Sequence, residues 1–206
     1  MKIIAEKLEK KFRKERIFTD FSYQFEQGNS YAITGPNGSG KSSLLKILSF
    51  YSLPTNGSLT LLDSKGHHIA NDLSYKYVSY AAPYIQLIEE FTLYELLEFA
   101  IQAKLIDTNT KKEEFEQFLD LYPIKGKLIA NYSSGMRQKI KLGLALFSKR
   151  PILLLDEPCT NLDRKAKDWF FEKLNNEKNR LIILASNEKE EIDFCQKSIS
   201  IEEFKK

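Results

Sequence analysis

The stretch "GPNGSGKS" at residues 35–42 decides the fold, because it sets three glycines and a lysine between two regular elements. The preceding "SYAIT" reads as a strand, and the following "SSLLKILSF" reads as a helix. Glycines permit a tight turn and let backbone N–H groups face phosphate oxygens. The stretch matches the phosphate-loop pattern G-x-x-x-x-G-K-[ST], and its strand and helix neighbours argue against a plain glycine-rich turn.

The chain is therefore expected to bind a nucleoside triphosphate with Mg²⁺. Lys41 would reach the β- and γ-phosphates, and the hydroxyl of Ser42 would ligate the metal. The residues of this stretch expected to bind the nucleotide are Gly35, Asn37, Gly38, Ser39, Gly40, Lys41, Ser42 and Ser43.

Two adjacent acids end the apolar run "ILLLDEP" at residues 152–158. Asp156 would emerge beside the phosphate loop and hold Mg²⁺ through water. Glu157 is placed to act as general base on an attacking water. The two acids could instead mark only the end of a strand, but burying charge without a partner costs several kcal/mol. Glu157 and Lys41 are thus the expected catalytic residues.

A serine–glycine turn opens the helical stretch "NYSSGMRQKIKLGLALF" at residues 131–147. The first N–H groups of a helix lack partners within the helix, so such a turn can bind an anion. Taken alone, the turn is more typical of an ordinary helix cap.

Composition indicates an ordinary globular protein. The 206 residues fit one domain, with 42% hydrophobic and 29% charged residues. A net charge of +3 gives no argument for a nucleic-acid partner, and the basic stretch 7–16 contains two glutamates and reads as a solvated face. Two cysteines give no disulfide framework. Without a signal peptide or a run of eighteen apolar residues, a cytoplasmic protein is expected.

Strands and helices alternate at both ends of the chain, which predicts a parallel sheet covered on both faces. The stretch 21–34 alternates on both sides of "EQGN" and predicts a hairpin. A helical insertion is expected at about 84–149. Further expected strands are 58–63, 75–82, "PILLLDEP", "RLIILAS" and "KSISI", and expected helices are 92–105, 111–122 and "RKAKDWFFEKLNNEK".

Together these stretches resemble the nucleotide-binding subunit of an ATP-binding-cassette (ABC) transporter over nearly the whole chain. "YSSGMRQ" is similar to the signature motif LSGGQ, with Tyr132, Ser134 and Met136 as substitutions. The resemblance implies one ABC ATPase domain over residues 1–206. Its fold would be an α/β P-loop NTPase (RecA-like) core with an antiparallel β subdomain and an inserted helical subdomain.

The resemblance also implies a partnership between chains. Ser133 and Gly135 stand at the signature positions that contact the γ-phosphate of ATP held by a second subunit, so a homodimer would enclose two ATP molecules. Hydrolysis would reopen the dimer and drive a separate transmembrane permease on the cytoplasmic face of the membrane. Asp163 in "TNLD" resembles the D-loop residue at the dimer interface, and Phe12 stands where an aromatic stacks on adenine, although it is equally typical of a strand.

Two positions depart from the family pattern. Asn187 replaces the histidine that contacts the γ-phosphate, and asparagine can donate a hydrogen bond but cannot titrate near neutral pH. Ala82 or Pro83 occupies the expected position of the glutamine loop, and Gln86 follows three or four residues later. Asn187 remains a candidate catalytic residue, and whether Gln86 takes the glutamine's place stays open.

Three functional readings follow from the resemblance. The first is an ATPase that powers transport, with the short chain and the "SSGMRQ" form resembling export-type subunits. The alternatives are a soluble ATPase switch without a permease and a degenerate cassette that binds ATP with little hydrolysis. His67 and His68 are expected in an exposed loop, Trp169 in the core, and Cys159 as a packing residue.

Overall fold

A computed structural model describes residues 1–13, 15–106, 110–121 and 126–205, which form two compact units. We call residues 1–80, 150–157 and 177–206 the core unit. Residues 81–149 and 158–176 are the helical unit. None of the helices within the described ranges is both long enough and apolar enough to cross a membrane.

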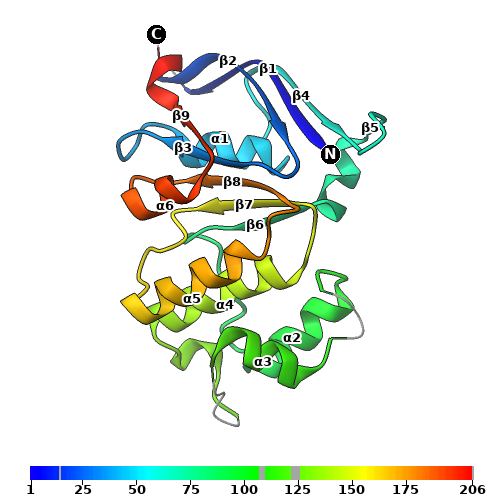
Figure 1. Ribbon diagram of the computed structural model, residues 1–206, viewed down its shortest axis with the longest axis vertical. Coiled ribbons are helices and arrows are strands. Elements are labelled where there is room, and N and C mark those ends of the chain that lie inside the picture. The colour runs from blue at the N-terminus through cyan, green and yellow to red at the C-terminus, as the bar shows by residue number, and fades with distance from the viewer. Residues whose placement is uncertain (14, 107–109, 122–125, 206) are drawn as a thin grey trace. The chain divides into compact units, whose positions relative to one another are not determined.

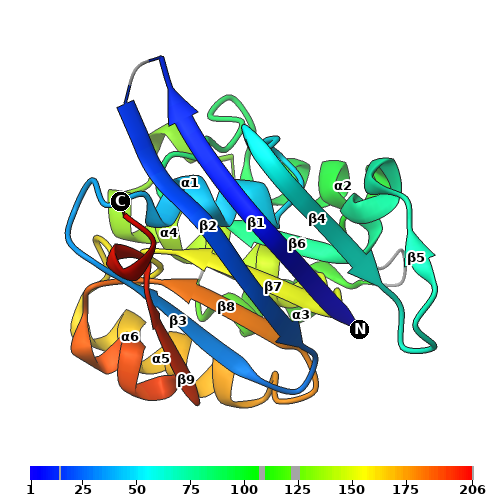
Figure 2. The ribbon, with the colours of Figure 1, turned by 90° about the horizontal axis from the view of Figure 1, so that it is seen from above.

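An antiparallel sheet in the core unit has the strand order β2-β1-β4-β5 (Figure 2). Its main pair sets Ile3 opposite Phe25, and both side chains are fully buried. Register shifts interrupt β1 between Ala5 and Lys11, so the strand does not alternate regularly along its length. The strands are β1 (Lys2–Phe12), β2 (Glu15–Glu26), β4 (Asn56–Leu62) and β5 (His68–Ile69).

A second sheet in the core unit has the order β6-β7-β8-β3-β9, and its pairs β7–β8, β8–β3 and β3–β9 are parallel. Every residue of β7 and β8 is buried, as their continuous apolar runs predict. The strands are β3 (Ser30–Thr34), β6 (Val78–Ala81), β7 (Ile152–Asp156), β8 (Leu181–Ala185) and β9 (Lys197–Ser200).

Helix α1 (Lys41–Leu48) lies between the two sheets of the core unit (Figure 1). It contacts β1 on one side and β7 and β8 on the other. Its side chains Leu44, Leu45, Ile47 and Leu48 are fully buried, and each such burial stabilises the fold by about 1.5–3 kcal/mol. The phosphate-loop helix is therefore fixed by the main hydrophobic core. The remaining core-unit helices are α6 (Lys189–Phe194) and the 3₁₀ helices η1 (Asn71–Lys76) and η3 (Ile201–Phe204).

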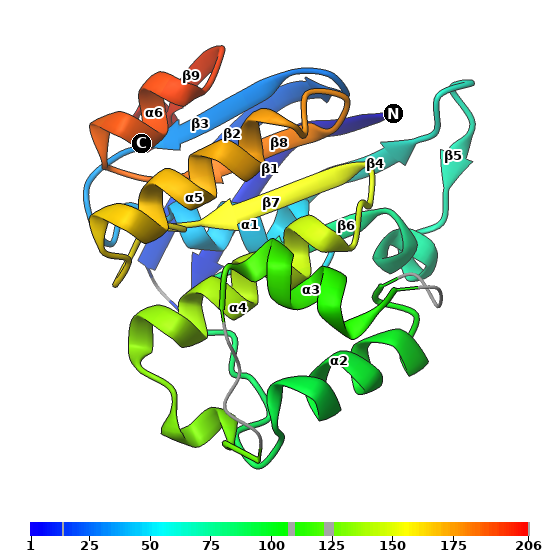
Figure 3. The same cartoon turned by 60° about the horizontal axis from the view of Figure 1, so that its bottom comes forward.

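Helix α4 (Ser134–Phe147) is central to the helical unit, where it packs against α3 (Lys112–Leu119) and α5 (Arg164–Asn175) (Figure 3). A Cβ on Gly143 would lie 2.1 Å from Leu119, which shows how closely α3 and α4 approach. Helix α2 (Leu93–Gln102) begins with a capping box in which Thr92 and Glu95 bond to each other's backbone N–H groups. A short 3₁₀ helix, η2 (Ile129–Asn131), precedes α4.

The predicted hairpin over residues 21–34 is wrong. β2 pairs with β1, whereas β3 pairs with β8 and β9 in the other sheet. The physical reason is burial: Tyr31, Ala32 and Ile33 are all inaccessible, which a strand achieves in the middle of a parallel sheet. The turn at Gly28 and Asn29 therefore joins two sheets.

The expected α/β fold class is confirmed, with corrections at single elements. The strand expected over 75–82 shortens to Val78–Ala81, because residues 71–76 form a 3₁₀ helix. Helix α6 was not predicted. Stretch 7–16 is only partly a solvated face, since the carboxylate of Glu9 is buried among Lys11, Arg16 and Asn56.

Candidate functional site

A cavity of about 300 Å³ in the core unit brings the phosphate loop together with Glu157. Gly35 begins the loop, and its carbonyl oxygen accepts a hydrogen bond from Lys41. The residues that line the cavity are Ile17, Asn37, Gly38, Ser39, Gly40, Lys41, Ser42, Ser43 and Glu157. The predicted loop residues thus gather around one hollow with the predicted general base.

Gly40, the N-cap of α1, shows why the loop needs glycine. Its φ is +107°, and a Cβ there would lie 2.4 Å from the Cγ2 atom of Ile17. Side chains other than glycine rarely adopt this backbone conformation, and the close approach leaves no room for one.

Replacing Gly40 by alanine is therefore expected to destabilise the protein and weaken ATP binding. Overpacking of this kind costs about 1–3 kcal/mol, and each kcal/mol lowers the melting temperature by about 2–4 °C in a chain of this size. Gly66→Ala is a matched control, because Gly66 also has a positive φ (+85°) but has open space around its Cβ position. Thermal melting and ATP titration of both variants test this. Equal losses in both variants would contradict it.

Lys41 is 4% exposed, and its Nζ donates to the carbonyl oxygens of Gly35 (2.7 Å) and Pro36 (3.2 Å). Burial lowers the pKa of Lys41, while the nearby charges of Glu157 and Asp156 oppose that shift. The two carboxylates therefore favour the charged lysine that phosphate binding needs.

The two acids stand at the end of β7. Asp156 is 1% exposed. Glu157 has a φ of +44° and donates its backbone N–H to the carbonyl oxygen of Ala185 at 2.8 Å. A residue other than glycine in this conformation stores backbone strain of about 1–3 kcal/mol, which is common at functional sites.

The donor groups fit Mg²⁺. Ser42 and Asp156 offer hydroxyl and carboxylate oxygens, and Mg²⁺ is usually held by one or two carboxylates together with substrate phosphates. The described residues contain no cluster of three His, Cys, Asp or Glu side chains that could hold a metal alone. Phosphate oxygens and water would supply the remaining ligands of a metal at this site.

Asn187 follows β8, and its Nδ2 donates to Oδ1 of Asn37 in the phosphate loop at 2.8 Å. The residue at the histidine position is thus bonded to the loop itself. Phe12 is 54% exposed at the end of β1, with Nζ of Lys10 5.2 Å from its ring centre. Phe12 is not among the cavity-lining residues, whereas Ile17 of β2 is. No sequence signal distinguishes Ile17 from other strand residues.

The residue at position 187 is expected to determine how turnover depends on pH. Asparagine does not titrate, so an Asn187→His variant should gain a pH-dependent limb near pH ~6.5 that the parent lacks. The only two histidines, His67 and His68, lie outside the cavity and are exposed, but His68 is the first residue of β5 and so does not lie in a loop as expected. Steady-state rates of both proteins from acid to neutral pH test this, and superimposable profiles would contradict it.

A second cavity, of about 400 Å³, lies in the helical unit at the serine–glycine turn. It brings together Ser133, Gly135 and Asp163, the three residues expected at the dimer interface. The residues that line it are Asp120, Leu121, Ser133, Ser134, Gly135, Met136, Lys139, Asn161, Asp163, Lys165 and Ala166. We call it the signature cavity.

The serine–glycine turn caps helix α4, as a turn of this kind ordinarily does. Ser133 Oγ accepts the backbone N–H of Met136 at 3.2 Å, and Asp163 caps α5 in the same way through Ala166 at 2.8 Å. A Cβ on Gly135 would lie 2.8 Å from the carbonyl oxygen of Asn161, so glycine is needed where the two turns meet. The cap and the close approach together fix the turn.

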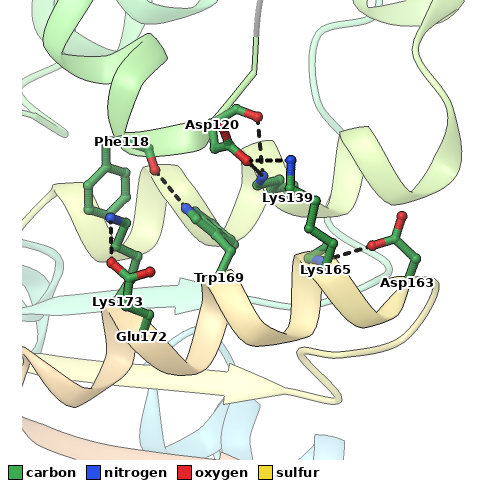
Figure 4. A network of polar contacts seen from close by, with 9 residues as sticks. Phe118, Asp120, Lys139, Asp163, Lys165, Trp169, Glu172 and Lys173 are labelled. Atoms are coloured by element: carbon green, nitrogen blue, oxygen red, sulfur yellow. Dashed lines mark hydrogen bonds and ion pairs between the residues drawn. The ribbon is translucent and has the colours of Figure 1, made fainter.

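Two lysines share one carboxylate in the signature cavity (Figure 4). Lys165 Nζ is 3.2 Å from Oδ2 of Asp120, and Lys139 Nζ is 3.7 Å from the same atom. Lys139 is 6% exposed and lies 4.8 Å from the ring centre of Trp169. Lys165 and Lys139 hold the pKa of Asp120 below its usual value, and burial lowers the pKa of Lys139. Two cations beside a helix N-terminus suit an anionic ligand.

Comparison with known proteins gives a consistent result. The family model described as ABC transporter matches residues 18–160. The chain is 34% identical over 188 residues to the uncharacterised ABC transporter ATP-binding protein YybJ of Bacillus subtilis strain 168, covering 90% of this chain and 85% of that protein. It is 31% identical over 190 residues to the lipoprotein-releasing system ATP-binding protein LolD of Rickettsia felis, covering 85% and 81%.

A solved structure has the same fold. It is a dimeric ATP-binding cassette in a post-hydrolysis state bound to ADP and Pi, with a TM-score of 0.80, 21% identity and coverage of 96% of this chain and 93% of that one.

Proposed function

The chain belongs to the ABC transporter family as one of its ATP-hydrolysing subunits, and on that premise we propose that ATP draws two copies of it together. One observation carries the proposal: the phosphate-loop cavity and the signature cavity are built from different units of the chain. ATP held at the loop of one copy would meet Ser133 and Gly135 of the second copy. Each nucleotide would then add contacts that separated copies lack, which stabilises the dimer.

Within one copy, the phosphate loop and Lys41 bind and orient the phosphates. Ser42 and Asp156 would hold Mg²⁺, which supplies neutralisation of the phosphate charge when it is bound. Glu157 accepts the proton of the attacking water. Asn187, bonded to Asn37, positions the phosphate loop.

The second copy contributes the signature cavity. Gly135 allows the turn to approach the phosphates closely, and Ser133 presents its hydroxyl and the N-terminus of α4. Asp163 caps α5 beside that turn. Hydrolysis removes the γ-phosphate, and with it the attraction that joins the two copies.

ATP-dependent association tests the proposal. Glu157→Gln should trap the closed state, because ATP still binds but is not consumed. Light scattering should give a dimer with ATP and a monomer with ADP. A second variant, Glu157→Gln with Gly135→Asp, should stay monomeric, because the added carboxylate repels the phosphates and contacts Asn161. A monomer for Glu157→Gln at saturating ATP would refute ATP-driven dimerisation.

We also propose that the chain works with a separate permease at the cytoplasmic face of a membrane and that transport is outward. The family membership and the LolD relative, which is named for lipoprotein release, support a transport role. The "SSGMRQ" form of the signature motif supports export. Gentle solubilisation of membranes that contain the tagged protein should recover a polytopic membrane protein in stoichiometric amount. Recovery with a soluble partner only would instead favour a soluble ATPase switch that acts without a permease.

A further inference from the structure

Helix α4 begins at the serine–glycine turn, and its side chains donate hydrogen bonds to backbone carbonyls of three other segments in the helical unit. Arg137 donates to the carbonyl oxygens of Ala130 (3.2 Å) and Tyr132 (3.1 Å), just before the turn. Gln138, which is 3% exposed, donates to Pro158 at 2.9 Å, and Pro158 follows Glu157 in the chain. Arg137 thus bonds the helix to the segment just before it, and Gln138 bonds it to a segment 20 positions further along the chain.

The third of these bonds is made by Lys141. Its Nζ donates to the carbonyl oxygen of Pro83 at 2.7 Å, across 58 positions of the chain. The side chain is half-buried, and burial together with the charge of Arg137 lowers its pKa. A hydrogen bond from a charged donor is about twice as strong as a neutral one.

The segment that receives this bond is a tight turn. Ile85 donates its N–H to the carbonyl oxygen of Ala82 at 3.2 Å, and the proline ring fixes the φ of Pro83. The proline ring and the hydrogen bond across the turn both restrict the backbone around Pro83, so we expect a displacement of its carbonyl to be transmitted to the turn. This is also the segment where the sequence departs from the glutamine-loop pattern, with Gln86 exposed after the turn.

We propose that Lys141 is a positioning residue that couples the signature turn to segment 82–86. Lys141 lies eight residues after Ser133 on one continuous helix, about 12 Å along its axis. Because the helix is rigid over that length, a displacement of its first turn by ATP and a second copy reaches Nζ and then the Pro83 carbonyl. The inference rests on the proposed ATP-driven dimer and adds the route by which the dimer is sensed at this loop.

Hydrogen exchange measured by mass spectrometry tests the coupling in the full chain carrying Glu157→Gln. ATP is expected to slow amide exchange in two peptides by about tenfold for each stabilising bond of this kind. The first is the signature peptide 131–138, and the second is peptide 84–91, which overlaps the coupled segment 82–86. Adding Lys141→Met should keep the first effect and abolish the second. Adding Lys141→Arg should restore the second, since guanidinium can donate to the same carbonyl.

Two further variants provide a control and an independent test of the role of Lys141. Lys149→Met is the matched control, because Lys149 is exposed just after the same helix, and it should leave both effects intact. Lys141→Gln keeps a polar side chain that is one bond shorter than lysine. It should lose the ATP effect on peptide 84–91 as Lys141→Met does, and it provides a second test if Lys141→Met folds poorly.

Two results would overturn the inference, and they are distinguishable. ATP-slowed exchange in 84–91 that persists in both Lys141→Met and Lys141→Gln would remove Lys141 from the route while leaving the dimer untouched. No effect of ATP on 131–138 in the Glu157→Gln parent would instead refute the dimer and the coupling together.

Discussion

Glu157→Gln is expected to lower ATP turnover by about 10²- to 10⁴-fold, the usual contribution of a general base. Glu157 lines the phosphate-loop cavity together with Lys41, its φ is +44°, and its backbone N–H donates to the carbonyl oxygen of Ala185. Glutamine keeps the shape of the side chain but cannot accept a proton from water. ATP affinity should therefore be retained while hydrolysis is lost.

Phosphate release under saturating ATP and Mg²⁺ measures this effect. Glu203→Gln, which removes an exposed glutamate elsewhere in the core unit, should behave as the parent does. Parent turnover no higher than that of Glu157→Gln, with the membrane partner present, would contradict the prediction. That outcome would identify the chain as a degenerate cassette that binds ATP with little hydrolysis.

Lys41→Met is expected to weaken ATP binding by roughly 30-fold or more, because truncating one partner of a buried charge pair costs about 2–5 kcal/mol. Lys41 lines the cavity and is nearly inaccessible. When ATP binds, its Nζ would exchange its hydrogen bonds to the carbonyls of Gly35 and Pro36 for contacts with the phosphates. Methionine fills the same space without charge. Adenosine affinity, which involves no phosphate, should change little.

Equilibrium titration with a fluorescent ATP analogue measures the loss. Lys178→Met removes an exposed lysine from the core unit and should leave affinity unchanged. If Lys41→Met bound ATP as tightly as Lys178→Met, Lys41 would have no part in phosphate binding.

Strands buried on both faces were predicted well, because their signal is local. β7 and β8 are continuous apolar runs, and β3 and α1 flank the glycine-rich loop. The hairpin was predicted wrongly because alternation does not say which strand is the partner. Two other elements had weak signals in the sequence. Register shifts break the alternation of β1, and α6 is only six residues long and depends on packing against β3.

The residues of the candidate sites also differ in how far the sequence predicts them. The residues of the phosphate loop follow each other in the chain, so the motif alone predicts them. Ile17 comes from β2, and the Asp120–Lys165 pair joins the end of α3 to the start of α5. Such neighbours are created by the fold and leave no spacing rule in the sequence. Lys141 and Pro83 belong to the same class.

Mixing two inactive variants tests whether the serine–glycine turn of one copy acts on ATP held by a second copy. Lys41→Met keeps an intact signature turn, and Gly135→Asp keeps an intact phosphate loop, which ATP titration of that variant can verify. In a mixed dimer, one composite site contains both intact parts.

Each variant alone is expected to be inactive, and an equal mixture of the two is expected to hydrolyse ATP. With random pairing, half of the dimers are mixed and each has one intact site of two, so roughly a quarter of the parent turnover is expected. A mixture as inactive as its separate components would show that the serine–glycine turn does not act on the nucleotide of a second copy.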